Sequence, residues 1–343
     1  MLIPLRRLAA VLIAAALATA ACGTPPEPTD PEAGGGAATD TFPVSVEHKF
    51  GSTEITAEPQ RIVTVGLMDQ DALLALGIVP VGTTEWFGEY PGAIHPWAQD
   101  ELGSSPPPEV LSSVSTEFEK IAALAPDLIL AQYAGLDQAT FDTLSQIAPT
   151  IAQPGEYVDY GVPWQDLTRT VGAAVGRAAE ADRLVTDLET DIAAAAAEHP
   201  EFSGATALTV TPFEGYYVYG PQDPRSRFLA DLGFEIPAAV GELTGEQFGA
   251  NVSREQIGLL DTDVLIWVTE GDVGQESIRS DPLYAGFEVV AQGRDIFVND
   301  AAEPELYGAT SFQSVLSIPV LLEGLVPRMS AAVDGDPATP TTP

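Results

Sequence analysis

Positively charged residues are scarce in this chain of 343 residues, where 14 Lys and Arg stand against 50 Asp and Glu. The formal net charge of -36 at pH 7 repels the phosphate backbone of DNA and RNA, so we expect no nucleic-acid partner. Neither of the two lysines, Lys49 and Lys120, follows a Gly-x-x-x-x-Gly run, which excludes a P-loop nucleotide site. The hydrophobic content of 45% still suffices for a sizeable buried core, which excludes a wholly disordered chain.

Histidine is also rare, and we expect His48, His95 and His199 on a strand, in a loop and at the end of a helix. A protein that binds a metal ion directly needs several His, Asp or Glu ligands that converge, so we expect no metal site. The chain lacks the Gly-x-Ser-x-Gly and His-Glu-x-x-His motifs of common hydrolases. The sequence therefore favours a binding protein over an enzyme.

The single cysteine, Cys22, has no partner for an internal disulfide, and the residues before it are more informative. Arg6 and Arg7 precede an apolar run over residues 8–18, the pattern of a secretory signal peptide at 1–21. That run is too short to span a bilayer of about 30 Å. Residues 19–23, TAACG, resemble a bacterial lipobox, with Thr19 where such boxes usually carry Leu. The resemblance implies an exported lipoprotein, anchored through Cys22 to the cell membrane on its extracytoplasmic side.

Two segments have compositions that do not support a packed core. Residues 22–42 are rich in Gly, Pro, Thr and Ala, which predicts a flexible tether that carries the lipid. Residues 332–343 have a similar composition and predict a disordered tail. Nothing after the signal peptide has 18 consecutive apolar residues, so we expect no membrane-spanning segment there. The folded part of the chain is therefore expected at about residues 43–331.

An internal repeat indicates the architecture. Residues 119–130, EKIAALAPDLIL, align without gaps with residues 255–266, EQIGLLDTDVLI, and each copy predicts a helix, a turn and a buried strand. Earlier in each half, an apolar strand leads to a helix that ends at a glycine, Gly77 or Gly233. A chance match between short apolar patterns is the alternative. The repeat predicts an α/β fold with two open α/β lobes, at residues 43–162 and 200–331.

A helical connector is expected between the lobes. Residues 163–199 are dense in Ala, Leu, Glu and Arg, and no proline follows Pro163 within them. We expect one long helix here, with Gly172 and Gly176 as places where it can kink. A helix of about 30 residues is about 45 Å long, which is enough to reach along both lobes and to limit their opening.

Several segments, taken in order, resemble the class III substrate-binding proteins of ABC importers, in particular the iron-siderophore and cobalamin branch. They are residues 59–63 (PQRIV), 75–78 (ALGI), 119–121 with 126–129 (EKI and PDLI) and 253–257 (SREQI). The resemblance covers about residues 45–330 and implies a class III periplasmic-binding-protein fold that captures a ferric siderophore between its lobes. It implies no cofactor, because the siderophore holds the iron. It also implies a monomer that delivers its ligand to an ABC permease and its ATPase subunits.

Glu119 and Glu255 match the acidic residues, one in each lobe, that dock such proteins into arginine pockets of the permease. The internal repeat independently makes them equivalent, because each glutamate is the first residue of its copy. The alternative is a purely local role, since a carboxylate at the start of a helix interacts favourably with the helix dipole by about 0.3–1 kcal/mol. We expect docking, because the pairing of carboxylates across the lobes is what a permease would bind.

The ligand candidates are aromatic residues and arginines, because a siderophore complex is a bulky, partly apolar chelate. They lie in loops at the carboxyl ends of predicted strands, where open α/β sheets bind ligands. The first-lobe candidates are Trp86, Tyr90, Trp97 and Tyr133, and the second-lobe candidates are Tyr216, Tyr217, Arg225, Arg227, Phe248 and Tyr307. Tyr307 begins a YGAT run that resembles hydroxamate-siderophore binders, which carry Trp at the position of Phe248. For each aromatic residue alone, local packing is the alternative.

One positive charge that the family often has is missing. Residues 111–115, LSSVS, stand where an arginine often precedes the first-lobe glutamate, so the cleft depends on Arg225, Arg227 and Arg279. In so negative a field a highly anionic catecholate complex would be repelled, which favours a hydroxamate or mixed chelate. A haem or cobalamin binding protein of the same fold is the alternative function, since Tyr can ligate haem iron. A purely structural lipoprotein would leave the aromatic candidates unexplained.

Overall fold

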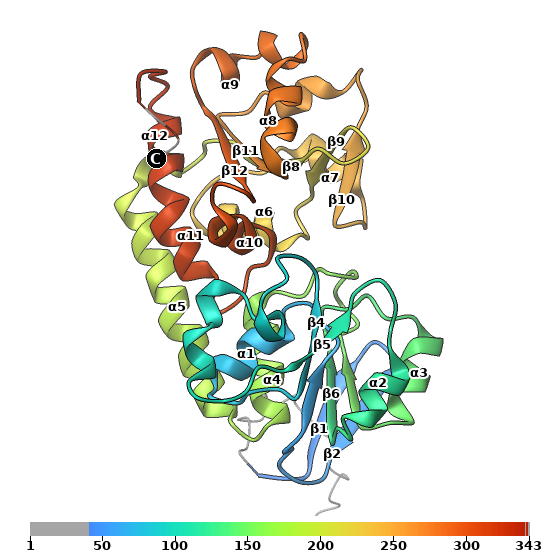
Figure 1. Cartoon of the computed structure of the whole chain (residues 1–343). Helices are drawn as coiled ribbons and strands as arrows, with labels where there is room; N and C mark the ends of the chain where they lie inside the picture. Colours follow the sequence, from blue (N-terminus) through green and yellow to red (C-terminus); the bar gives the residue numbers. More distant parts are fainter. Residues whose placement is uncertain (1–40, 340, 342–343) are drawn as a thin grey trace, which may run out of the picture. The chain divides into compact units, whose positions relative to one another are not determined.

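The computed structural model describes residues 41–339 and 341 (Figure 1). The predicted signal peptide, the lipidated Cys22 and nearly all of the tether at 22–42 lie outside the described residues. Within the described part, no helix is both long enough and apolar enough to cross a bilayer.

The N-terminal lobe is built on a parallel sheet with the strand order β5-β4-β3-β6-β7. Its strands are β3 (Ile62–Thr64), β4 (Gly82–Glu85), β5 (Glu109–Ser112), β6 (Leu128–Ala131) and β7 (Thr150–Ala152). An antiparallel hairpin of β1 (Val44–His48) and β2 (Gly51–Ile55) precedes this sheet. All four residues of β6 are buried, as expected for a parallel strand covered on both faces.

The helices of this lobe are α1 (Asp69–Ala75), α2 (Phe118–Ala123) and α3 (Gln138–Ser145). Three short 3-10 turns, η1 (Pro91–Ala93), η2 (Pro96–Ala98) and η3 (Asp100–Leu102), lie between β4 and β5. The predicted end of α1 at a glycine is confirmed, because Gly77 has a φ of +71°.

The C-terminal lobe has a mixed sheet with the strand order β10-β9-β8-β11-β12. Its strands are β8 (Ala207–Thr211), β9 (Tyr216–Tyr219), β10 (Gly249–Val252), β11 (Val264–Thr269) and β12 (Asp295–Asn299). Strands β8, β11 and β12 run parallel, whereas β9 is antiparallel to both of its neighbours. Around this sheet lie α6 (Pro224–Asp231), α7 (Ala238–Thr244), α8 (Gly271–Arg279), α9 (Glu288–Ala291), α10 (Pro304–Ser311), α11 (Ile318–Gly324), α12 (Val326–Val333), η4 (Pro200–Phe202), η5 (Ile257–Leu260) and η6 (Tyr284–Gly286).

The internal repeat is confirmed in the topology of the two sheets. Its apolar ends form β6 and β11, and each strand lies parallel to the first strand of its own sheet, β3 or β8. The segments before these strands differ, because the first copy forms α2 whereas the second forms only the 3-10 turn η5. Gly258 within η5 is a weak helix former, which favours the shorter turn.

The connector is two helices, so the prediction of one helix over residues 163–199 is wrong. Helix α4 (Trp164–Ala174) packs on α1 and β1, and α5 (Ala178–Glu198) follows after a break of three residues. At the break Gly176 has a φ of +70°, and the amide of Arg177 donates to the carbonyl of Gly172, which together end the first helix. Helix α5 alone then runs alongside both lobes (Figure 1).

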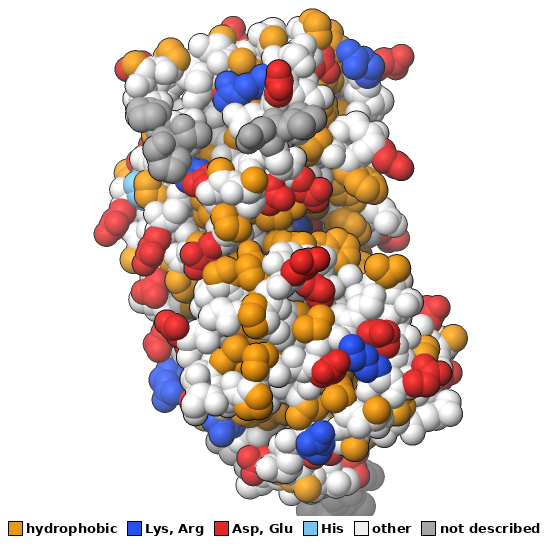
Figure 2. All heavy atoms as spheres, viewed as in Figure 1, with side chains coloured by type: hydrophobic (Ala, Val, Ile, Leu, Met, Phe, Trp, Pro, Cys, Tyr) orange, Lys and Arg blue, Asp and Glu red, His pale blue; other side chains and the backbone are white. Residues whose placement is uncertain are grey.

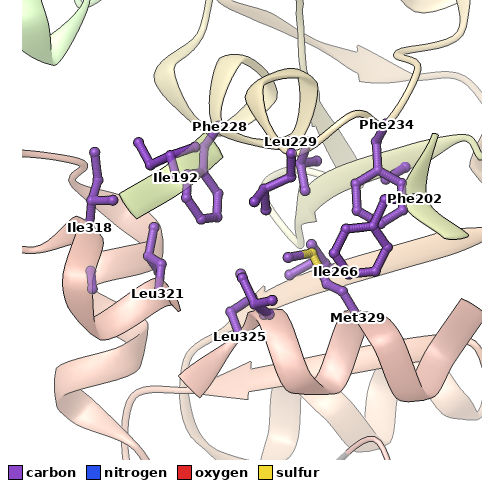
Figure 3. Close-up of a cluster of buried hydrophobic side chains, with 14 of the residues drawn as sticks. Ile192, Phe202, Phe228, Leu229, Phe234, Ile266, Ile318, Leu321, Leu325 and Met329 are labelled. Carbon is purple, nitrogen blue, oxygen red and sulfur yellow. The ribbon is translucent and has the colours of Figure 1, made fainter. Parts of the chain in front are cut away.

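Helix α5 contributes to the cores of both lobes. Ala181 near its start packs in the N-terminal core with Val171 of α4, whereas Val185, Leu188 and Ile192 pack in the C-terminal core. Figure 3 shows this second core, where α6 faces β11 and α12 through Phe228, Leu229, Ile266 and Met329. The helix therefore joins the two lobes through buried side chains.

The predicted disorder of residues 332–343 is wrong for the part of the tail that the structure describes. Helix α12 continues to Val333, because Ala332 is buried in the same cluster as Met329. Farther along, the Thr341 hydroxyl donates a hydrogen bond of 3.1 Å to the carbonyl of Asp295 on β12. The tail thus packs back onto the edge strand of the C-terminal sheet.

Candidate functional site: an aromatic cleft between the lobes

Aromatic side chains from both lobes meet where the carboxyl ends of the parallel strands face each other. This interlobe cleft is the position at which open α/β sheets bind ligands. Figure 2 shows hydrophobic side chains gathered along the boundary between the lobes, with few Lys or Arg among them. The rings that form the cleft are those of Trp86, Phe87, Tyr133, Tyr160, Tyr217, Tyr219, Phe248, Tyr307 and Phe312.

Phe312 is the centre of this aromatic group. It follows α10 of the C-terminal lobe, yet it is buried in the core cluster of the N-terminal lobe. Its ring stacks on Phe87, with centroids 5.6 Å apart and an interplanar angle of 17°, and it meets Trp86 edge to face at 6.2 Å. Tyr133 lies 6.4 Å from the same ring. Trp86 is 57% exposed, so a large apolar face remains open at this end of the cleft.

Strand β9 sends alternate tyrosines to opposite faces of its sheet. Tyr217 and Tyr219 lie on the cleft side, 5.5 Å apart, and Phe248 lies 5.9 Å from Tyr217. Phe248 also approaches Tyr160 of the N-terminal lobe, at 6.0 Å. The structure does not bring Tyr216 to this group: its ring packs on Trp267 and its hydroxyl donates to Asp281 on the other face.

Arg225 is held in a buried ion pair at the base of the cleft. Its Nη1 lies 2.9 Å from Asp223 Oδ2, and its Nη2 donates to the carbonyl of Ser311 at 2.6 Å. The guanidinium also lies 4.0 Å from the centre of the Tyr219 ring. Burial raises the pKa of Asp223 although Arg225 lowers it, and Asp223 is 1% exposed. The positive charge of Arg225 is therefore compensated within the protein, and its buried Nε has no hydrogen-bond partner among the residues that the structure describes.

Arg227 joins the two lobes differently. Its Nη1 donates to the carbonyl of Gly161, and its guanidinium lies 5.6 Å from the centre of the Tyr157 ring. Among the described residues no carboxylate lies within 4.0 Å of it. Burial lowers the pKa of Arg227, with nearby Tyr157 and Asp223 opposing that effect. Arg227 is thus a half-buried cation, and it lines a hollow of about 390 Å³ that also includes Asp166, Glu189 and Asp231.

Tyr307 and Tyr90 lie at the rim of the cleft near α10. The Tyr307 hydroxyl donates to Glu270 at 3.4 Å, and its ring lies 5.2 Å from Phe87 across the lobes. Burial raises the pKa of Tyr307, and Glu270 adds to that rise. Tyr90 packs at 5.3 Å on His95. Both tyrosines are neutral hydrogen-bond donors at neutral pH.

Trp97 lies behind this rim and contacts other groups. Its ring stacks on His95 with centroids 4.5 Å apart and an interplanar angle of 1°, and its Nε1 donates to Asp71 Oδ2 at 2.8 Å. His95 is buried, which lowers its pKa to about 4, so the imidazole is neutral. Trp97 is therefore part of the packing between α1 and α10.

The cavity that Trp86 and Tyr160 line is small. A cavity of about 80 Å³ lies on the N-terminal side, between Thr84, Trp86, Leu111, Glu117 and Tyr160. Sites for small molecules usually measure about 300–1,000 Å³. A ligand larger than this cavity would therefore require side chains around it, such as the exposed Trp86, to move aside.

Glu119 and Glu255 are both exposed, outside the cleft. Glu119 lies in the first turn of α2. Glu255 borders a surface hollow of about 530 Å³ that is also lined by Glu242, Leu243 and Leu259. Each carboxylate precedes the equivalent strand of its lobe, β6 or β11, as the repeat predicts.

The candidates from the sequence left out several residues of the cleft. Tyr219 is two residues from Tyr217 on the same strand, so strand alternation would have found it. Asp223 caps α6 just before Pro224, a helix-start pattern that the sequence displays. Phe87, Tyr160 and Phe312 had no such local signal. Among the described residues, no group of three or more His, Cys, Asp or Glu could hold a metal ion.

Proteins of known structure share this architecture. A periplasmic solute binding protein from Mycobacterium smegmatis is 37% identical, with a TM-score of 0.74, and the match covers 84% of this chain and 98% of that chain. PiaA from Streptococcus pneumoniae, solved in complex with ferrichrome, is 27% identical, with a TM-score of 0.75, and the match covers 85% and 99% of the two chains.

A sequence relative is named for siderophore binding. The probable siderophore-binding lipoprotein YfiY of Bacillus subtilis is 28% identical over 273 residues, which cover 75% of this chain and 80% of that protein. The family model described as periplasmic binding protein matches residues 62–301, a range that includes every strand of both sheets. The chain therefore belongs to the periplasmic binding protein family and is a substrate-binding protein, not an enzyme.

Proposed function

We propose that this chain captures a ferric siderophore in the interlobe cleft outside the cytoplasmic membrane and delivers it to an ABC permease for iron uptake. The observation that carries the proposal is the convergence of aromatic rings from both lobes on Phe312 and Phe248. Such rings suit a bulky, partly apolar chelate. Similarity to a protein solved with ferrichrome and to a probable siderophore-binding lipoprotein supports the same ligand class.

Within the cleft we assign the ligand contacts to residues that face it. The proposed contacts are Trp86, Tyr90, Tyr133, Tyr217, Phe248 and Tyr307, with Arg227 as the cation. Arg225 would support the cleft floor, because Asp223 and Ser311 already occupy its terminal nitrogens. Compensation of Arg225 leaves little free positive charge, so we propose a chelate of low net charge, such as a ferric hydroxamate.

Delivery requires partners that the chain would reach from the membrane. We propose that a lipid on Cys22 anchors the protein and that Glu119 and Glu255 dock it onto arginines of the permease. Both carboxylates are exposed and belong to equivalent positions of the two lobes. ATP hydrolysis in the partner subunits would drive transport, and a monomer suffices for this role.

Tryptophan fluorescence tests the ligand class. The chain is titrated with ferrichrome, ferric citrate, a ferric catecholate, haem and cobalamin, and Trp86 lies exposed beside the cleft as a reporter. We expect saturable quenching by ferrichrome and weaker binding of the anionic complexes. Saturable binding of haem alone, with a Soret band, or of cobalamin alone would replace the proposed ligand. No saturable response to any of these compounds would refute the proposed function.

A further inference from the structure

The segment between β4 and β5 lies between the two lobes. Its 3-10 turns η1, η2 and η3 cover residues 91–102, which we call the brace segment. Ile94, Ala98 and Leu102 of this segment are buried against Leu74 of α1 in a small apolar cluster. Leu316, from the chain between α10 and α11, packs onto the same cluster. The brace segment therefore touches a part of the chain that belongs with the C-terminal helices.

Trp97 of the brace segment is fixed by a buried carboxylate. Its Nε1 donates to Asp71 Oδ2 at 2.8 Å, and the Ser314 hydroxyl donates to the same oxygen. Asp71 is only 2% exposed, so these hydrogen bonds lie away from bulk solvent. Ser314 lies in the chain that joins α10 to α11. One carboxylate of α1 thus holds both the brace segment and a crossing of the chain between the lobes.

The ring of Trp97 lies directly on the backbone of α10. A Cβ atom placed on Gly308 would come within 2.7 Å of the Trp97 ring, closer than real Cβ contacts allow. His95 stacks on the same ring, with centroids 4.5 Å apart. Trp97 and Leu316 also pack against the C-terminal core as well as the small cluster of the brace segment. The ring is therefore wedged between an N-terminal loop and a C-terminal helix.

We infer that Trp97 is a positioning residue that sets the separation of the two lobes. Its hydrogen bond to Asp71 and its contact with Gly308 hold the ring in place. The residues that we propose as ligand contacts on either side, Tyr90 and Tyr307, lie next to this contact. A displacement of the ring would shift them relative to each other and reduce the fit of a ligand held by both. The brace acts on the apo protein as well, so it does not depend on the identity of the ligand.

A pair of glycine substitutions isolates the contact. Gly308→Ala adds a methyl group where the Trp97 ring lies, whereas Gly241→Ala adds one in α7, where the nearest atom is 3.6 Å away. Alanine favours a helix at both positions, so a purely local effect would stabilise both variants. Trp97→Phe removes the hydrogen bond to Asp71. Its control is Trp267→Phe, which removes an indole hydrogen bond of 2.8 Å to Tyr284 within the C-terminal core.

Interlobe distance is measured by electron paramagnetic resonance between spin labels. With Cys22→Ser the chain has no other thiol, so cysteines introduced at the exposed Ser145 of α3 and Glu242 of α7 take the labels alone. We expect the distance distribution to shift or broaden in Gly308→Ala and Trp97→Phe, and to stay unchanged in Gly241→Ala and Trp267→Phe. Unchanged distances in the folded Gly308→Ala variant would overturn the inference.

Ligand affinity is the second readout. If the proposed function is correct, ferrichrome binding should weaken by about tenfold in Gly308→Ala, because Tyr90 and Tyr307 would no longer be placed to contact one ligand together. It should be unchanged in Gly241→Ala. If no ferric siderophore binds the parent chain, the proposed function fails, and the label distances still decide whether Trp97 braces the lobes. Wild-type affinity in Gly308→Ala would refute the positioning role of Trp97, because the contact would then matter only for packing.

Discussion

At the residue scale, burial decides the chemistry of the carboxylates near the cleft. Burial raises the pKa of Asp71 to about 6, although its hydrogen bonds from Ser314 and Trp97 favour the charged form. Burial also raises the pKa of Asp69, to about 7, against the opposing effect of the amides of Tyr133 and Gln132. Within the described part of the chain, neither Asp69 oxygen has a hydrogen bond of ordinary geometry. Both side chains therefore cost stability when they ionise.

Asp71→Asn should remove one of these costs. The folded pKa of about 6 exceeds the unfolded value of 3.8, so the contribution of Asp71 to stability is greatest below pH 4 and is lost as the pH rises through 6. Asparagine keeps an acceptor for Trp97 and Ser314 without the charge. We expect the variant to be more stable than the parent at pH 8, by up to about 3 kcal/mol, and to lose this advantage near pH 4.

Urea unfolding of both proteins at pH 4, 6 and 8 measures the difference. The other titratable neighbours, Asp69 on α1 and His95 stacked on Trp97, are present in both proteins. A difference in stability that does not change with pH would contradict the shifted pKa of Asp71.

Trp86→Ala should separate binding from stability. Because Trp86 is 57% exposed, its loss should change the free energy of unfolding by no more than about 0.5 kcal/mol. Ferrichrome affinity should fall by about tenfold or more, since large aromatic contacts dominate such sites. Calorimetric titration and urea unfolding give the two quantities. Leu283→Ala, which trims another exposed hydrophobic residue, is the control and should leave binding unchanged.

At the element scale, local patterns in the sequence predicted elements better than they predicted where side chains point. The repeat gave β6 and β11 correctly, because continuous apolar runs identify strands that are buried on both faces. It did not distinguish Tyr216 from Tyr217, although their side chains face opposite sides of β9. The break between α4 and α5 was missed because helix propensity alone cannot tell a kink from an end. That end depends on the positive φ of Gly176.

Gly176→Ala tests the importance of that break. Alanine would have to adopt a φ of +70°, a left-handed conformation that costs about 1–2 kcal/mol for residues with a Cβ. We therefore expect the unfolding free energy to fall by about that amount. Gly258→Ala in η5, which has open space around it and an ordinary φ, is the matched control. Equal stability of the two variants would mean that the α4–α5 turn tolerates another backbone conformation.

At the scale of the whole molecule, the sequence predicted two lobes and left their mutual contacts undetermined. Contacts such as Asp71 with Ser314 join residues 243 positions apart, which no local pattern encodes. The same holds for Phe312, which lies after a C-terminal helix and packs in the N-terminal core. The cleft could be located from strand ends, but its central ring could not. Glu119 and Glu255, in contrast, were paired by the repeat alone.

Reversal of the two docking charges should affect transport alone. Glu119→Arg with Glu255→Arg should abolish uptake of ⁵⁵Fe-ferrichrome by cells and leave ferrichrome affinity of the purified protein unchanged, because both side chains are exposed outside the cleft. Glu54→Arg with Glu198→Arg changes the net charge equally at two other exposed positions and should leave uptake intact. Loss of uptake in both double variants would assign the effect to net charge.

Helix α5 has one end in each core, with Ala181 buried on one side and Ile192 on the other. Unfolding of either lobe would expose the apolar side chains at one end of this helix to water. It would thereby weaken the packing of the helix on the other lobe. We therefore expect the two lobes to unfold as a single cooperative unit, with one thermal transition where two independent domains would give two. Limited proteolysis should then yield either the intact protein or small fragments, without a stable fragment that corresponds to one lobe.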